Sequence, residues 1–361
     1  MRVLIMGPYP PPNGGVQTNV VAIRNFLLQE GIPTAVINLT RFKQPDADEV
    51  YYPRDAFELV KLLFRLRYDV IHLHVGGNLA TRLLALSLVC SLLPWARVVL
   101  TFHSGGYPSS KEGRAARPFS LRGFVLRRFD RLIGVNPEVV DLFHRFGCAP
   151  QRTRLISPHV FPSDLRESEL FGDGQSLPEP LGPFFASHDP VLVAVAGLEP
   201  EYDLPQQLDV LPRVRALHPR AGLLIIGGGS LEDELRQLIA ADAHAEHILL
   251  CGDLPRPVTL AAVARSDVFL RTTWYDGDAI SVREALHLGT PVIATDNGMR
   301  PTGVRLIPMR DVDALENAIT EQLAIPGIRT PRGDQASEQN LRAVLDLYRE
   351  ITPADSSLRL E

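Results

Sequence analysis

The sequence predicts an α/β protein made of two doubly wound, Rossmann-like domains. Its 361 residues exceed what a single hydrophobic core commonly supports, which favours two domains of about 150–200 residues each. Short strand-type apolar runs alternate with helix-length segments, a pattern typical of a parallel sheet with helices on both faces. The alternation stops after about residue 161 and restarts at residue 191, so we place the domain boundary between these positions.

The first domain is expected over residues 1–165, beginning with the apolar N-terminal segment. Residues 166–190 are rich in Pro, Gly, Ser and acidic residues without a sustained period, and we interpret them as a linker. The expected strands of this domain are Val3–Met6, Ala35–Leu39, Val70–His74, Arg97–Phe102, Arg131–Val135 and Thr153–Ser157, and the expected helices are Val16–Glu30, Phe57–Leu66, Leu79–Leu93 and Pro137–Phe146.

The second domain is expected over residues 191–330, followed by a C-terminal helix and tail over residues 331–361. The last helix, Ser337–Ile351, has one apolar face and no strand after it, so we expect it to cross back onto the first domain. The expected strands are Val191–Ala196, Gly222–Gly227, Ile248–Cys251, Val268–Arg271, Pro291–Thr295 and Val304–Ile307, and the expected helices are Gln206–Leu217, Leu231–Ala241, Pro257–Arg265, Ser281–Leu288 and Val312–Leu323. Ligands of such folds bind beyond the carboxyl ends of the strands, so we expect a site in the cleft between the domains.

Cysteine usage and the N-terminal segment indicate a reducing compartment. The three cysteines, Cys90, Cys148 and Cys251, are isolated from one another and lack the paired spacing of a zinc site, so we expect no metal and reduced thiols. The chain starts directly with a strand-type run and shows no export signal. The longest apolar stretch, Leu83–Leu93, is well short of the ~20 residues that span a bilayer. We therefore expect a cytoplasmic protein.

The charges of the two halves differ in sign. Residues 1–165 carry 20 Lys and Arg against 12 Asp and Glu, whereas the rest of the chain carries 17 against 30. The first half should favour an anionic surface or acceptor. Its residues 111–131 combine Arg122, Arg127 and Arg128 with apolar neighbours, which fits peripheral contact with the inner face of a membrane or, equally, a solvated helix face. Nucleic acid is not expected, because no recognisable binding module is present.

Two glycine-rich loops lie between a strand and a helix. Gly14-Gly15 and Gly227-Gly228-Gly229 each let the backbone approach a ligand closely, and the N–H groups of the following helix favour phosphate. Each loop can also be a tight turn. Neither is a GxGxxG, and no acidic residue follows the first at the ~20-residue offset of a dinucleotide site, so no NAD-type cofactor is expected.

The segment of residues 267–298 is the most informative, because it places carboxylates around the start of a helix. Asp276 and Asp278 occupy a polar loop after a strand, and Glu284 lies in the first turn of the following helix. Carboxylates in a cleft are natural acceptors for the paired hydroxyls of a sugar or ribose. The alternative for Glu284 is that it complements the helix dipole.

In this order and spacing, the motifs resemble the family-4 glycosyltransferases of the GT-B fold over nearly the whole chain. The matching elements are Gly14-Gly15-Val16, the DVIHLH segment at residues 69–74, His103 in TFHSGG, the nucleotide loop Gly227–Leu235, and the Glu-x7-Glu element with its following GxPVIAT at residues 276–295. The resemblance implies a metal-independent, retaining transfer of sugar from a nucleoside-diphosphate sugar to a saccharide or lipid-linked acceptor, in polysaccharide or glycolipid synthesis, with the donor as co-substrate and no cofactor.

The resemblance also implies roles for individual residues. Glu284 would hold the ribose hydroxyls, and His103 would lie beside the donor sugar near the reacting carbon. The remaining donor contacts would come from Gly14 and Gly15 on the phosphate side, Asp278, Ala279 and Ile280 through their backbone N–H groups, Gly229 beside the base, and Asp276 in place of the first Glu of the pair. Asp276-Gly277-Asp278 is also the metal-binding signature of a different glycosyltransferase fold, but here it falls inside the Glu-x7-Glu element.

One departure from the family pattern concerns the diphosphate. The family has an Arg and a Lys after the first strand of the second domain, where this chain has Gly197 and Tyr202. We predict that Arg271, which ends a strand, supplies the missing positive charge, with Arg283 or Arg300 as lesser candidates. The alternative is that Arg271 only pairs with Asp276 or Asp278. The departure also keeps open a catalytically inactive nucleotide-sugar-binding subunit, and the shared fold keeps open a nucleotide-sugar 2-epimerase.

Overall fold

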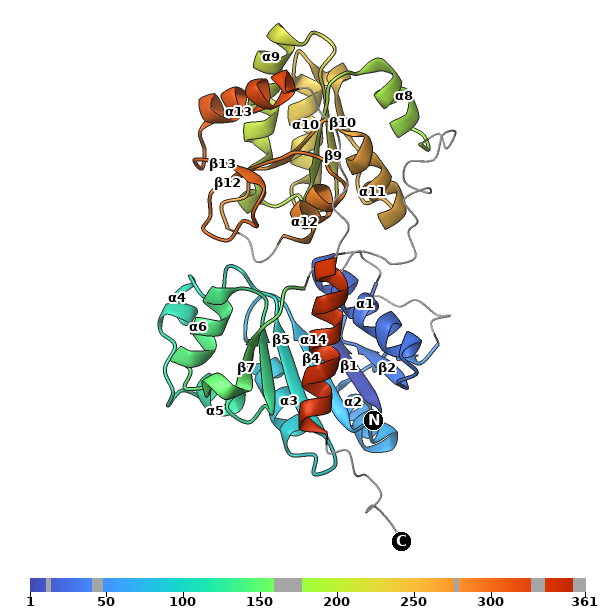
Figure 1. Ribbon diagram of the computed structural model, residues 1–361, viewed down its shortest axis with the longest axis vertical. Coiled ribbons are helices and arrows are strands. Elements are labelled where there is room, and N and C mark those ends of the chain that lie inside the picture. Colours follow the sequence, from blue (N-terminus) through green and yellow to red (C-terminus); the bar gives the residue numbers. More distant parts are fainter. Residues whose placement is uncertain (11–13, 41–47, 159–176, 276–278, 326–334, 353–361) are drawn as a thin grey trace. The chain divides into compact units, whose positions relative to one another are not determined.

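The chain folds into two compact α/β units, each built on one sheet (Figure 1). The computed structural model describes residues 1–10, 14–40, 48–158, 177–275, 279–325 and 335–352. Unit 1 comprises Met1–Val160 and Gln335–Glu361, and unit 2 comprises Phe161–Asp334. The expected doubly wound fold class is therefore confirmed in both halves of the chain.

Unit 1 contains a seven-stranded parallel sheet in the order β3-β2-β1-β4-β5-β6-β7. The two-residue strand β3 was missed by the sequence analysis, because so short a segment has no detectable period. The strands are β1 (Val3–Gly7), β2 (Thr34–Asn38), β3 (Val50–Tyr51), β4 (Val70–Val75), β5 (Arg97–Phe102), β6 (Arg131–Gly134) and β7 (Thr153–Leu155); the helices are α1 (Gly15–Gln29), α2 (Ala56–Leu66), α3 (Thr81–Ser91), α4 (Lys111–Arg114), α5 (Leu121–Leu126), α6 (Pro137–Arg145), the 3-10 turn η1 (Pro150–Arg152) and α14 (Gln335–Ile351).

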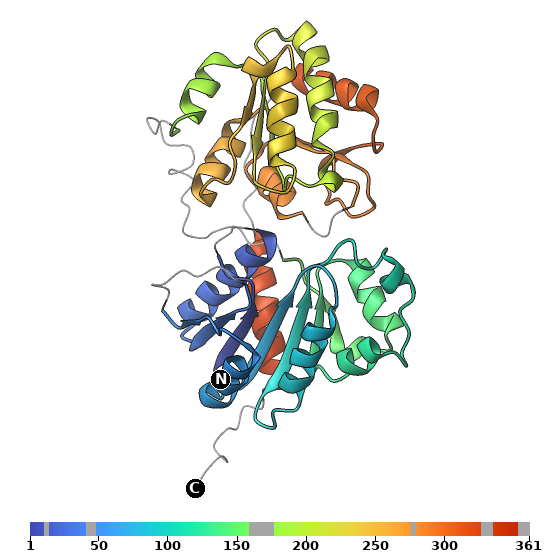
Figure 2. The same ribbon diagram turned by 180° about the vertical axis from the view of Figure 1, so that it is seen from behind.

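Helices cover both faces of this sheet, as the continuous burial of its strands requires. Helices α1 and α14 pack on one face, where Ile23 and Tyr348 meet side chains of β1, β4 and β5. Helices α2, α3, α5 and α6 pack on the other face, seen in the reverse view of Figure 2. The C-terminal helix α14 therefore belongs to unit 1, as expected from its single apolar face.

Unit 2 contains a six-stranded parallel sheet in the order β10-β9-β8-β11-β12-β13. Helices α9, α10 and α13 pack on one face and α8, α11 and α12 on the other. The strands are β8 (Val191–Val195), β9 (Gly222–Ile226), β10 (Ile248–Leu250), β11 (Val268–Arg271), β12 (Val292–Thr295) and β13 (Val304–Ile307); the helices are α8 (Leu181–Ser187), α9 (Leu204–Leu217), α10 (Glu232–Ala241), α11 (Arg256–Arg265), α12 (Ile280–His287), α13 (Val312–Ala324) and the 3-10 turns η2 (Pro200–Tyr202) and η3 (Ala245–His247).

The expected linker at residues 166–190 is wrong in its C-terminal part. Helix α8 lies inside this range, and its Leu181 and Phe184 are buried in the core of unit 2. The many Pro and Gly residues of the segment concealed a helix of only seven residues, which is too short to show a period. Residues 166–176 lie outside the described part of the chain.

No helix in the described parts of the chain is both long and apolar enough to cross a membrane. Helix α3, which overlaps the longest apolar stretch, has 11 residues. Its Leu84 and Cys90 are buried, and Arg82 is exposed.

Candidate active site

Three histidines form a connected cluster in unit 1 that runs from the middle of β4 to the carboxyl end of β5. His72 and His74 alternate along β4 and therefore lie on the same face of the sheet, with ring centroids 4.1 Å apart. His103 directly follows β5, and its Nε2 lies 3.1 Å from Nδ1 of His74. His72 is held from both sides, by the Tyr348 hydroxyl at 2.5 Å and by Oγ1 of Thr101 at 2.7 Å. The cluster thus connects helix α14 to the carboxyl end of β5.

The contact between His74 and His103 determines where their protons lie. One ring must donate to the other, and Nε2 of His74 is buried without a hydrogen-bond partner among the described residues. A buried N–H without an acceptor is rarer and costlier than a buried lone pair without a donor. His74 therefore carries its proton on Nδ1 and donates it to Nε2 of His103. His103 in turn carries its proton on Nδ1, where it can donate to a ligand oxygen.

All three imidazoles are neutral at physiological pH. Burial, and then the proximity of His103, lowers the pKa of His72 to about 3. Burial also lowers the pKa of His103 to about 3, and burial together with His72 and His103 lowers the pKa of His74 well below its usual value. A charge in such a site would lose its hydration without gaining a counterion. His103 is therefore suited to hydrogen bonding and not to acting as a cation.

The start of helix α1 lies next to the segment that follows β4, because a Cβ on Gly76 would lie 3.4 Å from Cγ2 of Val16. Gly14 is its N-cap, and no side chain caps the first turn. The nearest atoms to a Cβ on Gly14 would belong to the flexible end of Gln17, whose Oε1 would lie 2.8 Å away and could move aside. By contrast, a Cβ on Gly7 would lie 2.9 Å from that of His74, which explains the glycine that ends β1. Gly14 and Gly15 therefore open the helix with accessible N–H groups, as a phosphate site requires.

In unit 2, the loop after β9 owes its glycines to close packing. A Cβ on Gly227 would lie 1.9 Å from the carbonyl oxygen of Ala196, and one on Gly229 would lie 2.5 Å from the backbone of Leu198. Gly227 also has a φ of +135°, which other residues rarely adopt. The structure thus supports the tight-turn interpretation of Gly229. Its predicted contact with a base stays a prediction.

Arg271 reaches the place where the family's two cations are missing. A Cβ on Gly197 would lie 3.2 Å from the ring of Tyr202, so the two substituted positions touch. The guanidinium of Arg271 lies over the ring of Tyr202, with Cζ of Arg271 4.6 Å from the ring centroid. Its Nη1 donates to the carbonyl oxygen of Val195 at 2.9 Å. Arg271 is only 6% exposed, so its charge is held in a site of low polarity next to the end of β8.

Arg300, a lesser candidate for the missing positive charge, joins two segments of the chain by hydrogen bonds. Its Nε donates to the carbonyl oxygen of Thr295 at 3.0 Å, and its Nη2 donates to the carbonyl oxygen of Thr273 at 3.4 Å. These contacts join the segments that follow β11 and β12. A structural role for Arg300 therefore has direct support, whereas its donor-binding role stays a prediction.

Glu284 is buried on α12 and forms an ion pair that the sequence analysis did not foresee. Nε and Nη2 of Arg256 both donate to Oε1 of Glu284, at 3.1 and 2.5 Å. Arg256 opens α11, and Glu284 is 8% exposed. Ala279 is the N-cap of α12 and Ile280 its first residue, without a side-chain cap. The expectation that Glu284 lies in the first turn is wrong, because the helix begins one residue earlier than expected and its first turn contains no acidic residue. The start of α12 therefore offers backbone N–H groups next to a fixed carboxylate.

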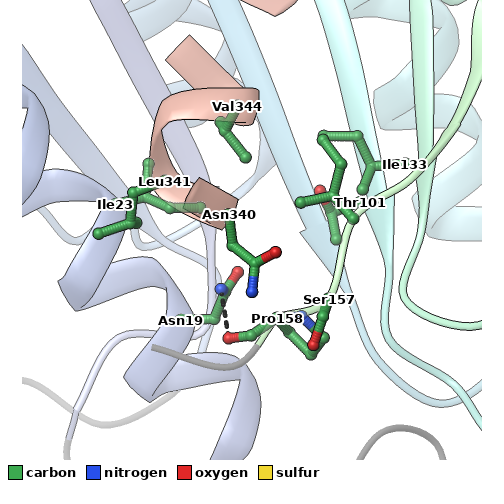
Figure 3. A pocket seen from close by; sticks show the side chains of 10 residues that line it. Asn19, Ile23, Thr101, Ile133, Ser157, Pro158, Asn340, Leu341 and Val344 are labelled. Atoms are coloured by element: carbon green, nitrogen blue, oxygen red, sulfur yellow. Dashed lines mark hydrogen bonds between the residues drawn. The ribbon is translucent and has the colours of Figure 1, made fainter. Parts of the chain in front are cut away.

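Asp276 and Asp278 lie outside the described residues, so their predicted contacts with the sugar and diphosphate stay predictions. Within the described ranges, no group of three or more His, Cys, Asp or Glu side chains is arranged so that it could hold a metal ion. A cavity of about 10 Å³ occurs in unit 1 between α1, the ends of β5 to β7 and α14 (Figure 3). Asn19 donates there to the carbonyl oxygen of Pro158 at 2.8 Å. The cavity has room for about one water and is too small for a sugar.

Sequence reasoning missed two functional candidates, Arg256 and His74. The signal for His74 was present in the sequence. His72 and His74 are alternate residues of one strand and His103 follows the next strand, so the three side chains come close together if these two strands pair. Arg256 gave a weaker signal, since its partner is 28 residues away on another helix. At the carboxyl ends of its strands, unit 1 thus has a neutral histidine donor and the N-terminus of α1. Unit 2 has the N-terminus of α12 and the buried cation Arg271 there. These groups suit an anionic ligand rich in hydroxyl groups.

Comparison with family models gives a match for each unit. Residues 13–163 match the model described as Glycosyltransferase Family 4, and residues 183–337 match Glycosyl transferases group 1. Together these matches take in most of the chain.

Relatives and solved structures point the same way. The chain is 29% identical over 150 residues to a GDP-mannose-dependent alpha-(1-6)-phosphatidylinositol monomannoside mannosyltransferase of Mycolicibacterium smegmatis, covering 38% of this chain and 39% of that protein. It is 29% identical over 222 residues to the corresponding enzyme for the monoacylated substrate from Corynebacterium glutamicum, covering 58% and 53%. The matches thus span about two fifths to half of these relatives. The Anabaena protein HepE, solved with UDP and glucose, has a TM-score of 0.65 at 16% identity and covers 97% of this chain and 98% of its own, which shows the fold.

Proposed function

Since the chain belongs to the family-4 glycosyltransferases of the GT-B fold, we propose that it transfers a sugar from a nucleoside-diphosphate sugar to a saccharide or lipid-linked acceptor, with retention of the anomeric configuration. We place this reaction in polysaccharide or glycolipid synthesis. The mannosyltransferase relatives, which are named for lipid-linked acceptors, support that placement.

The observation that carries this proposal is the arrangement around α12 in unit 2. A buried carboxylate, Glu284, lies one turn from an uncapped helix N-terminus, and the buried guanidinium of Arg271 ends the strand before that helix. Ser281 in the first turn of α12 and Arg271 both donate to the carbonyl oxygen of Val195, which brings the two elements together. This combination of a carboxylate, unpaired helix N–H groups and a cation supports the proposal that a nucleoside diphosphate binds here.

In unit 1, His103 is the residue that we propose to contact the donor sugar. Its neutral ring, with the proton on Nδ1, would donate a hydrogen bond to an oxygen of the donor sugar near the reacting carbon. No protein nucleophile is assigned. The rate enhancement would come from positioning the two substrates and from stabilising the departing diphosphate.

The test of the function is sugar transfer from radiolabelled nucleotide sugars to a panel of glycolipid and saccharide acceptors. GDP and UDP sugars are the first donors, because the relatives and the similar structure are named for these nucleotides. Release of free nucleotide without a glycosylated product would favour a 2-epimerase. Binding without any turnover would favour a catalytically inactive subunit.

Glu284→Ala is expected to weaken binding of GDP or UDP by tenfold or more. Hydrogen bonds to a charged acceptor contribute about 1.5–3 kcal/mol, and the ribose would lose this acceptor. Isothermal titration calorimetry measures the loss, with thermal unfolding as a check that unit 2 remains folded. Unchanged affinity in a folded variant would reject the role of Glu284 in donor binding.

We also propose that unit 1 contacts an anionic membrane surface through α4 and α5. Phe119 between these helices is fully exposed, and Phe124 on α5 is 47% exposed. Arg114, Arg117 and Arg128 around them are exposed as well. Exposed aromatic rings among basic side chains suit the interface of an anionic bilayer. Arg127 serves the fold instead, because it donates to the carbonyl oxygens of Pro118 and Phe146.

Sedimentation with phosphatidylglycerol vesicles is expected to capture the protein at low salt and to lose it at high salt. Each basic residue near such a surface contributes about 1 kcal/mol, and salt screens this term. The double variant Arg117→Glu, Phe119→Ser should abolish capture. Phosphatidylcholine vesicles are the control. Equal sedimentation of the variant would show that this surface is not the contact.

A further inference from the structure

We propose that Arg256 is a positioning residue that aims the carboxylate of Glu284 at the ribose of the donor. This inference rests on the proposed function, in which Glu284 accepts hydrogen bonds from the ribose hydroxyls. It concerns a residue outside the family motifs described above. Arg256 acts through Glu284 and is not itself assigned to the reaction.

The geometry of the pair sets the orientation of the carboxylate. Both donated hydrogen bonds from Arg256 end on the same oxygen, Oε1, at 3.1 and 2.5 Å. A planar guanidinium that grips one oxygen with two N–H groups fixes the rotation of the carboxylate and leaves Oε2 as the oxygen that it does not hold. Because Glu284 is buried, its side chain has few other ways to be oriented. The ligand would therefore meet a preorganised acceptor.

The position of Arg256 also favours a role in nucleotide binding. Arg256 is the first residue of α11 and is separated from the turn at residues 252–254 by the N-cap residue Pro255 alone. That turn packs against the glycine loop after β9, since Gly227 donates to the carbonyl oxygen of Gly252 at 2.9 Å. Arg256 thus connects two loops at the carboxyl edge of the sheet to the helix that carries Glu284. An ion pair that served only to join α11 to α12 could lie at any point along the two helices and would not need to lie beside these loops.

The decisive measurement compares nucleotides with and without ribose hydroxyls. Calorimetry with GDP and UDP, and with their 2′,3′-dideoxy analogues, gives the ratio of affinities that the hydroxyls provide. In the unmodified protein the natural nucleotide should bind about tenfold or more tightly than its analogue. Arg256→Ala should bring this ratio of affinities close to one. Arg256→Lys keeps the charge but cannot donate the same pair of hydrogen bonds, so it should retain part of the ratio. The double variant Arg256→Ala, Glu284→Ala should show no further loss of the ratio beyond Glu284→Ala.

Arg213→Ala is the matched control, because Arg213 pairs with Asp313 and Glu316 and links α9 to α13 on the opposite face of the same sheet. The ratio of affinities measured for Arg213→Ala should equal that of the unmodified protein. If Arg256→Ala and Arg256→Lys weaken both nucleotides equally and keep the ratio, the positioning role is overturned while donor binding stands. If the unmodified protein binds neither GDP nor UDP, the proposed function fails, and this inference fails with it.

Discussion

Arg271→Ala is expected to lower the rate of sugar transfer at saturating donor by about 100-fold or more, by analogy with the loss of one donor from an oxyanion hole. Arg271 lies against Tyr202, which stands where the family resemblance implies a lysine, and the Arg271 residue is 6% exposed. A cation in such a site is only weakly screened and can stabilise the negative charge that develops on a departing diphosphate. The measurement is the turnover number from initial rates.

A rescue experiment separates this role from a structural one. In the Arg271→Ala background, Tyr202→Lys returns a positive charge to the usual family position and should recover at least tenfold of the lost rate. A purely structural arginine would not be replaced in this way. Trp274, whose indole N–H donates to Asp203 at 2.9 Å, reports on the folded state of the same loop. A folded Arg271→Ala enzyme with near-normal turnover would refute the assignment.

Unit 1 is expected to lose stability steeply as the pH falls below about 6.5. The pKa of His72 is lowered to about 3 and that of His74 well below its usual value, so the unfolded chain takes up protons there that the folded chain does not. The stabilisation is complete above the unfolded pKa and is lost as the pH falls towards the folded pKa. His72 and His74 each contribute at most about 1.4 kcal/mol per pH unit, so the two together contribute at most about 3 kcal/mol per pH unit. That slope would exhaust a typical domain stability within a few pH units.

The two tryptophans allow this loss to be measured in unit 1 alone, since Trp95 lies in unit 1 and Trp274 in unit 2. Urea unfolding of a Trp274→Phe variant, followed by Trp95 fluorescence between pH 8 and pH 5, gives the slope. His74→Asn should reduce the slope by about 1.4 kcal/mol per pH unit. His144→Gln, on α6 outside the cluster, should leave it unchanged. A flat stability profile in the unmodified protein would contradict neutral buried imidazoles.

Much of the fold was available from local patterns. Strand-type runs such as Val70–His74 and amphipathic segments such as Ser337–Ile351 were predicted within one or two residues of their observed ends. The order of the motifs gave the family, which the two family matches confirm. Helix α8 and strand β3 were missed because they are shorter than any usable period. The predicted residues of the donor site remain predictions.

The sequence by itself determined two parallel-sheet domains, the family, and the segments that carry the candidate site, because hydrophobic periodicity and short motifs are properties of neighbouring residues. Only the tertiary structure decided which side chains meet. His74 finds His103 because β4 pairs with β5, Arg271 finds Tyr202 because β11 pairs with β8, and Arg256 finds Glu284 because α11 packs beside α12. Strand order and helix packing follow from how the whole core closes, and no local period encodes them.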